Sequence, residues 1–585
     1  MKSRFVALTG VVLLFAIASC GEESSPDGQS GAAGAASAGA AGGTSTSGNG
    51  GNPASGGTLG GAGSAGSAGA ASGAAGSPGG ASGRAGNGAG GSVAGGGASS
   101  GGAGNAGDAS GRGGNLAGAG AAGATGGLGG TGGMRPTVTA SPGTTLVKVN
   151  TAVRHQTFEG WGTSLCWWAN HVGGWSANAR NAVVEAVVDP VEGLGYNVFR
   201  YNIGGGENPA HDHMQEHRDM PGFQPVEGTW DWDADANQRA IVQRIVETGT
   251  DIVLEAFSNS PPYWMTKSGC ASGSSDGSNN LKDDAYGAFA DYLTEVVEHY
   301  RDEYGITFRT LEPLNEPNAN WWKSNGSQEG CHFSPSNQQT IIRAVAEQLA
   351  EKGLTETTVS ASDENSMDDA YDNLRAFDAT TLAAMSQINA HSYAGSRRAE
   401  LRQLASDRGK RLWQSESGPL NQTLNDDTDS ALFMAGRIIT DLRELKPEAW
   451  VDWQVGDPAR SWASISLNDG QQSFAPLKRF HMHAGFSRYI RPGATFVEID
   501  DPDMVAAVSA DDRSVAVVVR NGSTTASKAF TFDLTALRSV GAVVKVHRTS
   551  RSEDLEALPD VAVEDYSFVA TIPAFSVTTF VIAMP

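Results

Sequence analysis

Eight apolar, strand-like runs between residues 158 and 454 alternate with helix-like segments, and this alternation limits the possible folds more than any other feature of the chain. The strand-like runs fall at 158–162, 196–203, 252–257, 308–314, 358–362, 387–391, 411–414 and 449–454. Between them lie helix-like segments with apolar residues at helical spacing, such as 176–188, 236–247, 285–304, 336–352 and 429–445. A strand and a helix repeated eight times predict an α/β fold of the (β/α)₈ TIM barrel type.

The pattern changes after the barrel to short β-rich runs that no helical segment separates. These runs fall at 495–499, 505–508, 514–520, 529–534, 543–547, 567–572 and 576–582. They predict a C-terminal antiparallel β-sandwich at 491–585, which follows the barrel at 145–490 in the chain. A further run at 145–150 precedes the first barrel strand, and we expect it to join the sandwich.

Residues 1–20 have the sequence of an export signal. Lys2 and Arg4 precede an apolar run at 5–17, which is shorter than the roughly 20 residues that cross a bilayer. The small residues before Cys20 resemble a bacterial lipobox, which implies cleavage ahead of Cys20 and lipidation of its thiol. We therefore expect an exported lipoprotein at the cell surface or outer membrane, held to the membrane by this lipid. A plain secretory signal is the alternative.

Residues 21–135 predict a disordered tether between the signal and the barrel. The segment 21–133 holds 45 of the 77 glycines of the chain and no aromatic residue. Since a segment of this composition cannot bury a hydrophobic core, we expect it to stay unfolded.

The folded part is strongly acidic, which limits its partners. Residues 136–585 carry 36 basic and 60 acidic side chains. This balance argues against nucleic-acid binding and favours a neutral substrate. No Cys/His cluster has the spacing of a zinc site, and no glycine-rich loop lies between a strand and a helix. We therefore expect no metal and no cofactor. We also expect the protein to be a monomer.

Two glutamates, Glu316 and Glu416, come at or just beyond the ends of strand-like runs. They lie in the strings Leu314-Asn315-Glu316-Pro317-Asn318 and Leu412-Trp413-Gln414-Ser415-Glu416-Ser417-Gly418. The active site of a (β/α)₈ barrel lies at the C-terminal ends of its strands, so both side chains are expected there. Two carboxyl groups about 5–5.5 Å apart can cleave a glycosidic bond with retention of configuration.

An Asn-Glu-Pro after the fourth strand and a glutamate after the seventh resemble the large clan of retaining glycosidases built on (β/α)₈ barrels. Within that clan the chain is similar to glycoside hydrolase family 30 over residues 145–585. Four further strings carry the resemblance: Phe158-Glu159-Gly160-Trp161-Gly162, Phe199-Arg200-Tyr201-Asn202, Phe486-Ser487-Arg488-Tyr489-Ile490-Arg491-Pro492-Gly493 and Ser576-Val577-Thr578-Thr579-Phe580. The string at 162–169 is most similar to the endo-β-1,6-galactanase branch.

The resemblance implies that Glu316 is the acid/base and Glu416 the nucleophile. Asn315 is suited to hydrogen-bond the 2-hydroxyl of the sugar, and the resemblance implies the same role; a turn-forming role beside Pro317 is the alternative.

Further candidate substrate-binding residues lie at strand ends. Arg200 is expected to face Glu416 and keep it ionised, and a structural ion pair is its alternative role. His391 and Tyr393 are expected to orient Glu416, although His391 could equally be a core residue. Indole faces can stack on sugars, and the candidates are Trp168, Trp264, Trp321, Trp322 and Trp453, about half of which we expect in the core.

Once Cys20 is lipidated, three cysteines remain: Cys166, Cys270 and Cys331. Export would place them in an oxidising compartment, where disulfides can form. Cys270 and Cys331 each follow a strand of the expected active face, and we predict a disulfide between them. Cys166 is expected to stay a buried thiol.

Together these features predict a retaining endo-glycosidase that cleaves β-1,6-linked galactan in a polysaccharide or oligosaccharide substrate. Within the same family, a β-1,6-glucanase, a xylanase or a glucosylceramidase is the alternative. From a different class of protein, the alternative is a surface carbohydrate-binding lectin on an inactive barrel.

Overall fold

The computed structural model describes residues 135–585, apart from 250, 421–423, 425 and 458–459. The predicted signal, its lipidation site Cys20 and the predicted tether up to residue 134 lie outside the described residues. Arg135 is described, and its guanidinium donates to the carbonyls of Thr535 at 2.7 Å and Arg538 at 2.9 Å. Within the described part, every helix is too short or too polar to span a membrane.

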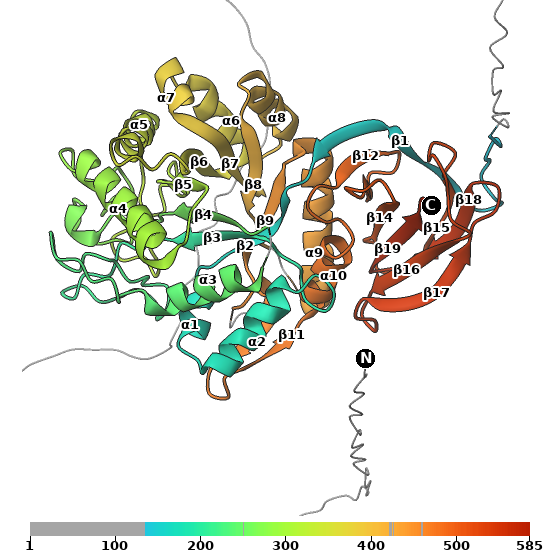
Figure 1. The fold of residues 1–585 in the computed structure, drawn as a ribbon, viewed down its shortest axis with the longest axis horizontal. Helices are drawn as coiled ribbons and strands as arrows, with labels where there is room; N and C mark the ends of the chain where they lie inside the picture. The colour runs from blue at the N-terminus through green and yellow to red at the C-terminus, as the bar shows by residue number, and fades with distance from the viewer. Residues whose placement is uncertain (1–134, 250, 421–423, 425, 458–459) are drawn as a thin grey trace, which may run out of the picture. The chain divides into compact units, whose positions relative to one another are not determined.

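Eight parallel strands close into a barrel in chain order, from β2 to β9, and β2 pairs with β9 (Figure 1). The strands are β2 (Gly160–Ser164), β3 (Val198–Asn202), β4 (Val253–Phe257), β5 (Thr310–Glu312), β6 (Thr358–Ser366), β7 (Met385–Ala394), β8 (Arg411–Glu416) and β9 (Ala449–Gln454). Each overlaps one of the eight predicted runs. The predicted (β/α)₈ barrel is therefore confirmed.

Helices cover the outside of the barrel. They are α1 (Trp168–Gly173), α2 (Ala177–Val188), α3 (Ala236–Thr248), α4 (Tyr286–Tyr304), α5 (Pro335–Glu351), α6 (Met367–Ala376), α7 (Ala379–Ala384), α8 (Arg398–Asp407), α9 (Asp427–Thr440) and α10 (Lys478–Ser487). Helix α4 shows why they dock. Phe289, Leu293, Val297 and Tyr300 recur every three or four residues and are all buried, so they form one apolar stripe against the barrel.

The C-terminal region forms a second unit of structure around its own core. Its strands are β12 (Thr495–Ile499), β13 (Met504–Val508), β14 (Ser514–Asn521), β15 (Lys528–Asp533), β16 (Val543–Thr549), β17 (Glu556–Ala562), β18 (Ser567–Ile572) and β19 (Ser576–Ala583). Stacked rings of Phe532 and Phe568, 4.5 Å apart, lie in that core beside Phe580. The predicted β-sandwich is confirmed.

Strand β1 (Thr145–Thr157) belongs to the C-terminal sheet although it precedes the barrel in the chain. Its first part pairs in parallel with β15, from Thr145 to Lys148. The strand then pairs antiparallel with β12, where Val149 lies opposite Ile499. The segment that leads into β2 is thus held by strands from the far end of the chain.

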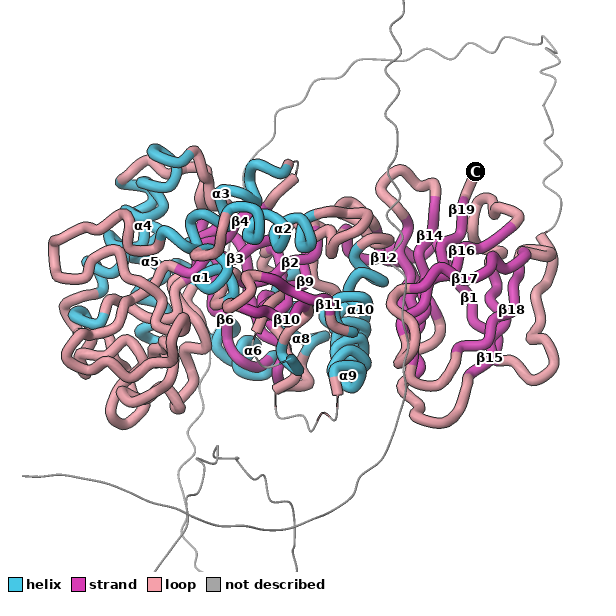
Figure 2. Tube along the Cα trace, turned by 90° about the horizontal axis from the view of Figure 1, so that it is seen from below, coloured by secondary structure: helices cyan, strands magenta, loops and turns pink. Residues whose placement is uncertain are grey.

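The barrel and the C-terminal sheet meet through α9 and α10, which lie on the side of the barrel next to that sheet (Figure 2). The hydroxyl of Thr579 on β19 donates to the carbonyl of Gly485 on α10 at 2.7 Å. A Cβ at Gly485 would lie only 3.3 Å from the same Thr579 oxygen, so a glycine allows this close approach.

Candidate active site

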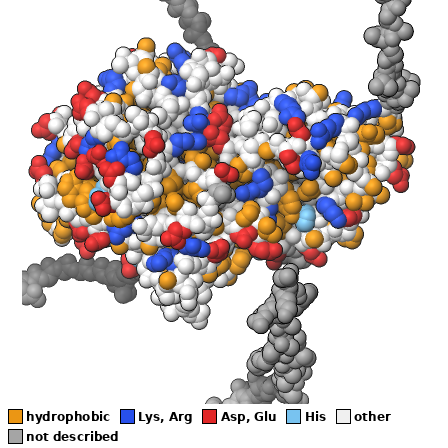
Figure 3. All heavy atoms as spheres, viewed as in Figure 1, with side chains coloured by type: hydrophobic (Ala, Val, Ile, Leu, Met, Phe, Trp, Pro, Cys, Tyr) orange, Lys and Arg blue, Asp and Glu red, His pale blue; other side chains and the backbone are white. Residues whose placement is uncertain are grey.

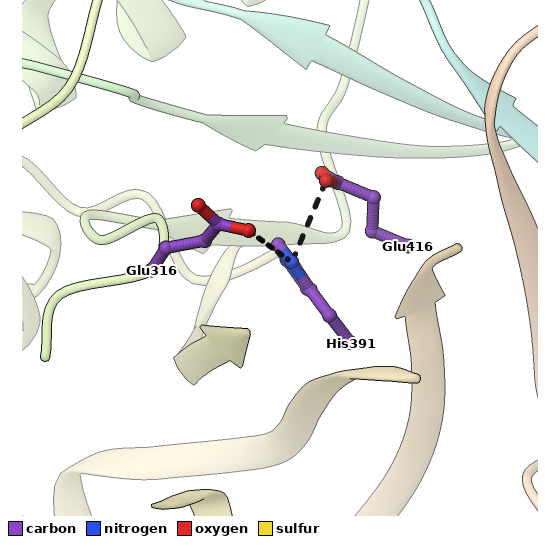
Figure 4. Close-up of side chains that lie close together, drawn as sticks. All are labelled: Glu316, His391 and Glu416. Carbon is purple, nitrogen blue, oxygen red and sulfur yellow. Dashed lines mark ion pairs between the residues drawn. The ribbon is translucent and has the colours of Figure 1, made fainter. Parts of the chain in front are cut away.

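The barrel brings Glu316, His391 and Glu416 together at the C-terminal ends of its strands. Glu316 follows β5, His391 lies in β7 and Glu416 is the last residue of β8. Both carboxylates lie beside the ring of His391 (Figure 4). The His391 Nδ1 atom lies 3.4 Å from Glu316 Oε1 and 3.5 Å from Glu416 Oε1. One carboxylate oxygen of each glutamate and a ring nitrogen of His391 all lie within 4.8 Å of one another.

Glu416 is held on both carboxylate oxygens. The hydroxyl of Tyr393 donates to Oε1 at 2.9 Å, and Nη1 of Arg200 lies 3.4 Å from Oε2. Burial raises the pKa of the Glu416 carboxyl to about 7, and the negative charge of Glu316 adds to that rise, whereas the cations of His391 and Arg200 oppose it. These contacts fix the position of the carboxylate and favour its ionised form.

Glu316 is held by its backbone as well as by its side chain. Its φ of 45° lies in the left-handed region, which is uncommon for a residue with a Cβ. The backbone N–H of Glu316 donates to the carbonyl of Asp363 at 2.8 Å, and the indole of Trp322 donates to the Glu316 carbonyl at 3.2 Å. The Asn365 amide donates to the carboxylate itself. The loop after β5 is thereby locked onto β6.

A network of buried charges lies beneath the two glutamates. Arg200 is fully buried and pairs with Glu255 at 2.8 Å, with Asp363 and with Glu416. Asp363 also accepts from the hydroxyl of Ser415 at 2.6 Å. Burial would raise the pKa of Asp363, but the cations of Arg200 and His391 outweigh it and hold that pKa well below its usual range.

Asp363 also sets the charge of His391. The Nε2 atom of His391 lies 3.1 Å from Asp363 Oδ1. Burial alone would lower the pKa of His391, yet the carboxylates of Glu416 and Asp363 outweigh burial and raise that pKa to about 10. His391 is therefore an imidazolium near neutral pH and places a fixed positive charge between the two glutamates.

Of the described residues, Glu316, His391 and Glu416 form the one group of three His, Cys, Asp or Glu side chains close enough to share a metal ion. The carboxylates of Glu416 and Asp363 raise the pKa of His391, so a metal ion bound here would have to displace the proton of its ring nitrogen.

Asn315 presents an open acceptor beside Glu316. Its side chain is buried, and its Oδ1 has no hydrogen-bond partner among the residues that the structure describes. Because an unpaired buried carbonyl is costly, a ligand hydroxyl that donates to it would be favoured.

A cavity of about 450 Å³ lies on the same face of the barrel. Residues that follow β2, β3 and β9 line it: Trp167, His171, Gln215, Glu216, His217, Arg218, Gln454, Gly456, Asp457 and Asp469. The indole of Trp167 is part of this lining. It packs edge-on against Trp453, with ring centres 5.1 Å apart, and the guanidinium of Arg218 lies over it at 4.4 Å.

The sequence model of the family described as O-glycosyl hydrolase family 30 matches residues 144–410. An endo-β-1,6-galactanase of Hypocrea rufa is 34% identical to this chain in an alignment of 452 positions that covers 72% of this chain and 91% of that protein. The chain belongs to glycoside hydrolase family 30. The resemblance seen in the sequence is thus confirmed, and the protein is an O-glycosyl hydrolase.

Other proteins match this family 30 chain less closely. An exo-β-1,6-galactobiohydrolase of Bifidobacterium longum is 27% identical in an alignment of 407 positions that covers 51% of this chain but only 26% of that protein. The catalytic domain of a family 30 xylanase C from Talaromyces cellulolyticus aligns with a TM-score of 0.60 and 19% identity, covering 75% of this chain and 100% of the other. At this identity the structural likeness shows the fold alone.

The tryptophans predicted as sugar platforms in this family 30 enzyme separate into buried and exposed ones. Trp168 is fully buried, and its indole donates to the carbonyl of Ser164 at 2.9 Å, so its predicted contact with substrate is wrong. Trp453 is 7% exposed, and Trp264 packs against the barrel core and donates to the Gln224 carbonyl. Trp321, in the loop after Glu316, is 51% exposed.

The predicted disulfide between Cys270 and Cys331 is wrong, because both thiols are free in the structure. Asn280 links the two loops instead: its side-chain amide donates to the Cys270 carbonyl at 3.1 Å, and its backbone N–H bonds to the Cys331 thiol. Burial raises the pKa of that thiol to about 12. Cys166 is also a free, fully buried thiol.

Replacing Trp321 with Ala is expected to raise KM by about 3- to 10-fold, since an exposed indole at the rim of the site can stack on a sugar. The value of kcat and the thermal midpoint should change little, because half of the side chain is already in solvent. Steady-state kinetics on a soluble oligosaccharide measure both constants. Val191→Ala, which is 66% exposed and lies ahead of β3 at the opposite end of the barrel, is the control. Equal KM values for the two variants would contradict a role for Trp321 in binding.

Proposed function

We propose that this family 30 enzyme is a retaining endo-glycosidase that cleaves β-1,6-linked galactan by double displacement. The observation that carries the proposal is the approach of the Glu316 and Glu416 carboxylates to within 4.8 Å. Retaining enzymes hold their carboxyl groups about 5–5.5 Å apart, whereas inverting enzymes need about 6.5–9.5 Å to admit a water molecule. The shorter separation favours direct attack by one carboxylate.

In the first step, a carboxylate oxygen of Glu416 attacks the anomeric carbon while Glu316 gives its proton to the departing glycosidic oxygen. The bond between the anomeric carbon and that oxygen breaks, and the sugar becomes an ester of Glu416. In the second step, the Glu316 carboxylate takes a proton from water. As that proton moves to Glu316, the water oxygen attacks the anomeric carbon and the ester bond to Glu416 breaks, so Glu416 leaves as a carboxylate and Glu316 is again protonated.

The surrounding residues support these steps through charge and position. Arg200 and the imidazolium of His391 stabilise the Glu416 carboxylate before attack and again when the ester is hydrolysed. Tyr393 holds the attacking group in place through its hydrogen bond at 2.9 Å. The open acceptor of Asn315 is suited to a sugar hydroxyl next to the reacting carbon.

The substrate assignment is supported by the relatives. The protein that is 34% identical is named an endo-β-1,6-galactanase, and the second relative is named for an exo activity on β-1,6-linked galactose. The cavity beside Trp167 offers room for further sugar units on the active face, as cleavage within a chain requires.

A panel of neutral and acidic polysaccharides tests the proposal. We expect release of reducing ends from β-1,6-galactan at a rate well above that from β-1,6-glucan or glucuronoxylan, with a ladder of oligosaccharides as early products. Proton NMR of the first product should show the β-anomer before mutarotation. Preferred cleavage of β-1,6-glucan, xylan or glucosylceramide would contradict the assignment of galactan as the substrate. An α-anomer as the first product would overturn the retaining mechanism.

We also propose that the enzyme is exported as a lipoprotein with its lipid on Cys20, followed by a tether to residue 135. The apolar run at 5–17 and the small residues before Cys20 support this proposal. Cys20→Ser is expected to move the protein from the membrane fraction to the soluble fraction of the producing cells. Ser24→Ala is the control. An unchanged membrane fraction in Cys20→Ser would contradict lipidation at this residue.

A further inference from the structure

A second cavity, of about 400 Å³, lies where helices α8 and α9 approach the loop between β12 and β13. Its lining is Tyr393, Ala394, Gly395, Arg398, Phe433, Gly436, Arg437, Ile439, Thr440, Pro502, Asp503 and Arg520. Neither catalytic glutamate lines it. Tyr393 connects the two sites, because it lines this cavity while its hydroxyl donates to Glu416.

Three arginines from three different elements line this cavity, with a single carboxylate. Arg398 comes from α8, Arg437 from α9 and Arg520 from β14. Asp503 is the only acidic residue in the lining, and it is already shared between Arg520 at 3.3 Å and Lys528 at 2.8 Å. Acidic and basic side chains are interspersed on the face of the molecule drawn in Figure 3.

Arg437 is the least satisfied of the three. Its guanidinium forms no hydrogen bond or ion pair in the described part of the chain, and its central carbon lies 5.4 Å from the centre of the Phe433 ring. Burial lowers the pKa of Arg437 and the nearby cation of Arg398 adds to that effect, while the carboxylate of Asp441 opposes it. A half-buried guanidinium of this kind offers its N–H groups to an anion.

The other two arginines are held in place with donors to spare. Nε of Arg398 donates to Asp441 at 2.8 Å and Nη1 donates to the Gly395 carbonyl at 2.9 Å. Nε of Arg520 donates to the Leu432 carbonyl at 2.8 Å and Nη1 to Asp503. In both, Nη2 makes no hydrogen bond to any described residue. A Cβ at Gly436 would lie 3.1 Å from the Arg520 guanidinium, so the glycine leaves room for this arrangement.

We propose that this cavity is a second ligand site, which binds the carboxylate of an acidic sugar. A planar guanidinium matches a carboxylate with two parallel hydrogen bonds, and Arg437 is free to make them. The ring of Phe433 next to it offers an apolar surface for the sugar ring. Binding at this site is separate from catalysis, and it does not depend on which neutral linkage the enzyme cleaves.

Calorimetric titration of the full mature protein tests this site, with D-glucuronate, inorganic phosphate and D-galactose as separate ligands. We expect glucuronate to bind more tightly than phosphate, and galactose to bind elsewhere or not at all. Arg437→Gln should weaken glucuronate binding by about tenfold or more, as expected for hydrogen bonds to a charged group. Arg437→Lys keeps the charge without the planar fork and should give an intermediate affinity.

Arg375→Gln is the matched control, because it removes an arginine from the exposed surface of α6, away from the cavity. It should bind glucuronate like the parent protein. Thermal midpoints of all variants identify any loss of folding, and Arg437→Lys keeps the test decisive if Arg437→Gln unfolds. Equal affinity of the Arg437 and Arg375 variants would overturn the proposal. Tighter binding of phosphate than glucuronate would also overturn it, since the site would then be one for inorganic oxyanions.

Discussion

Replacing Glu416 with Gln is expected to lower kcat by a factor on the order of 10⁴ or more. The amide has nearly the same shape, but it cannot form the glycosyl ester on which the proposed mechanism depends. Tyr393 can still donate to the amide oxygen, so the side chain should keep its position. The reaction is followed by release of an activated aryl leaving group, together with the thermal midpoint of the variant.

The control for this variant is Glu347→Gln, which makes the same chemical change on the exposed surface of α5. Its kcat should match that of the parent enzyme. If Glu416→Gln kept more than a few per cent of the activity of Glu347→Gln, Glu416 would not be the nucleophile.

Replacing Glu316 with Ala is expected to reduce kcat on natural glycosides by about 10²- to 10⁴-fold, the usual contribution of a general acid or base. For a substrate with a good leaving group, the rate of the first step should fall much less, because such a group needs little protonation to depart. Azide should then rescue turnover, because it attacks the glycosyl ester without a general base. The product should be the β-glycosyl azide, which NMR identifies.

The stereochemistry of rescue separates the two roles. In a Glu416→Ala variant, azide can enter the space left by the carboxylate and displace the aglycone directly, which gives the α-glycosyl azide. A β-azide from Glu416→Ala, or an α-azide from Glu316→Ala, would mean that the two roles are exchanged.

The barrel could be predicted because its strands are buried on both faces. Strands such as β3 (Val198–Asn202) and β9 (Ala449–Gln454) have every residue buried, so they appear as short apolar runs between helical segments. Strand β17 (Glu556–Ala562) was missed in the sequence. It lies at the edge of the C-terminal sheet with no buried residue, so its sequence has no apolar pattern to recognise.

The residues of the site that could be predicted are those whose place depends only on the end of their own strand. Glu316, His391, Tyr393, Glu416 and Arg200 do meet, because the barrel places all strand ends on one face. The sequence did not reveal the role of Asp363, which depends on contacts with three other strands, β3, β7 and β8. The sequence offers one signal for this role: Asp363 is an acidic residue near the end of a barrel strand, and no other function was assigned to it.

Two predictions failed because they depended on how loops fold. Trp168 lies at the beginning of a short helix, α1, and its indole turns back to bond with Ser164 inside the barrel. Burial of a tryptophan and the distance between two thiols are both set by loop conformation. Neither has a periodic signature in the sequence.

The pairing of β1 with β12 and β15 has a consequence for how the protein is made. Val149 leaves the ribosome about 350 residues before its partner Ile499, so β1 must wait for almost the whole chain before it can pair. Contacts of such high sequence separation form late and slowly. The barrel strands β2–β9 are therefore synthesised before the sheet that holds β1 can be completed.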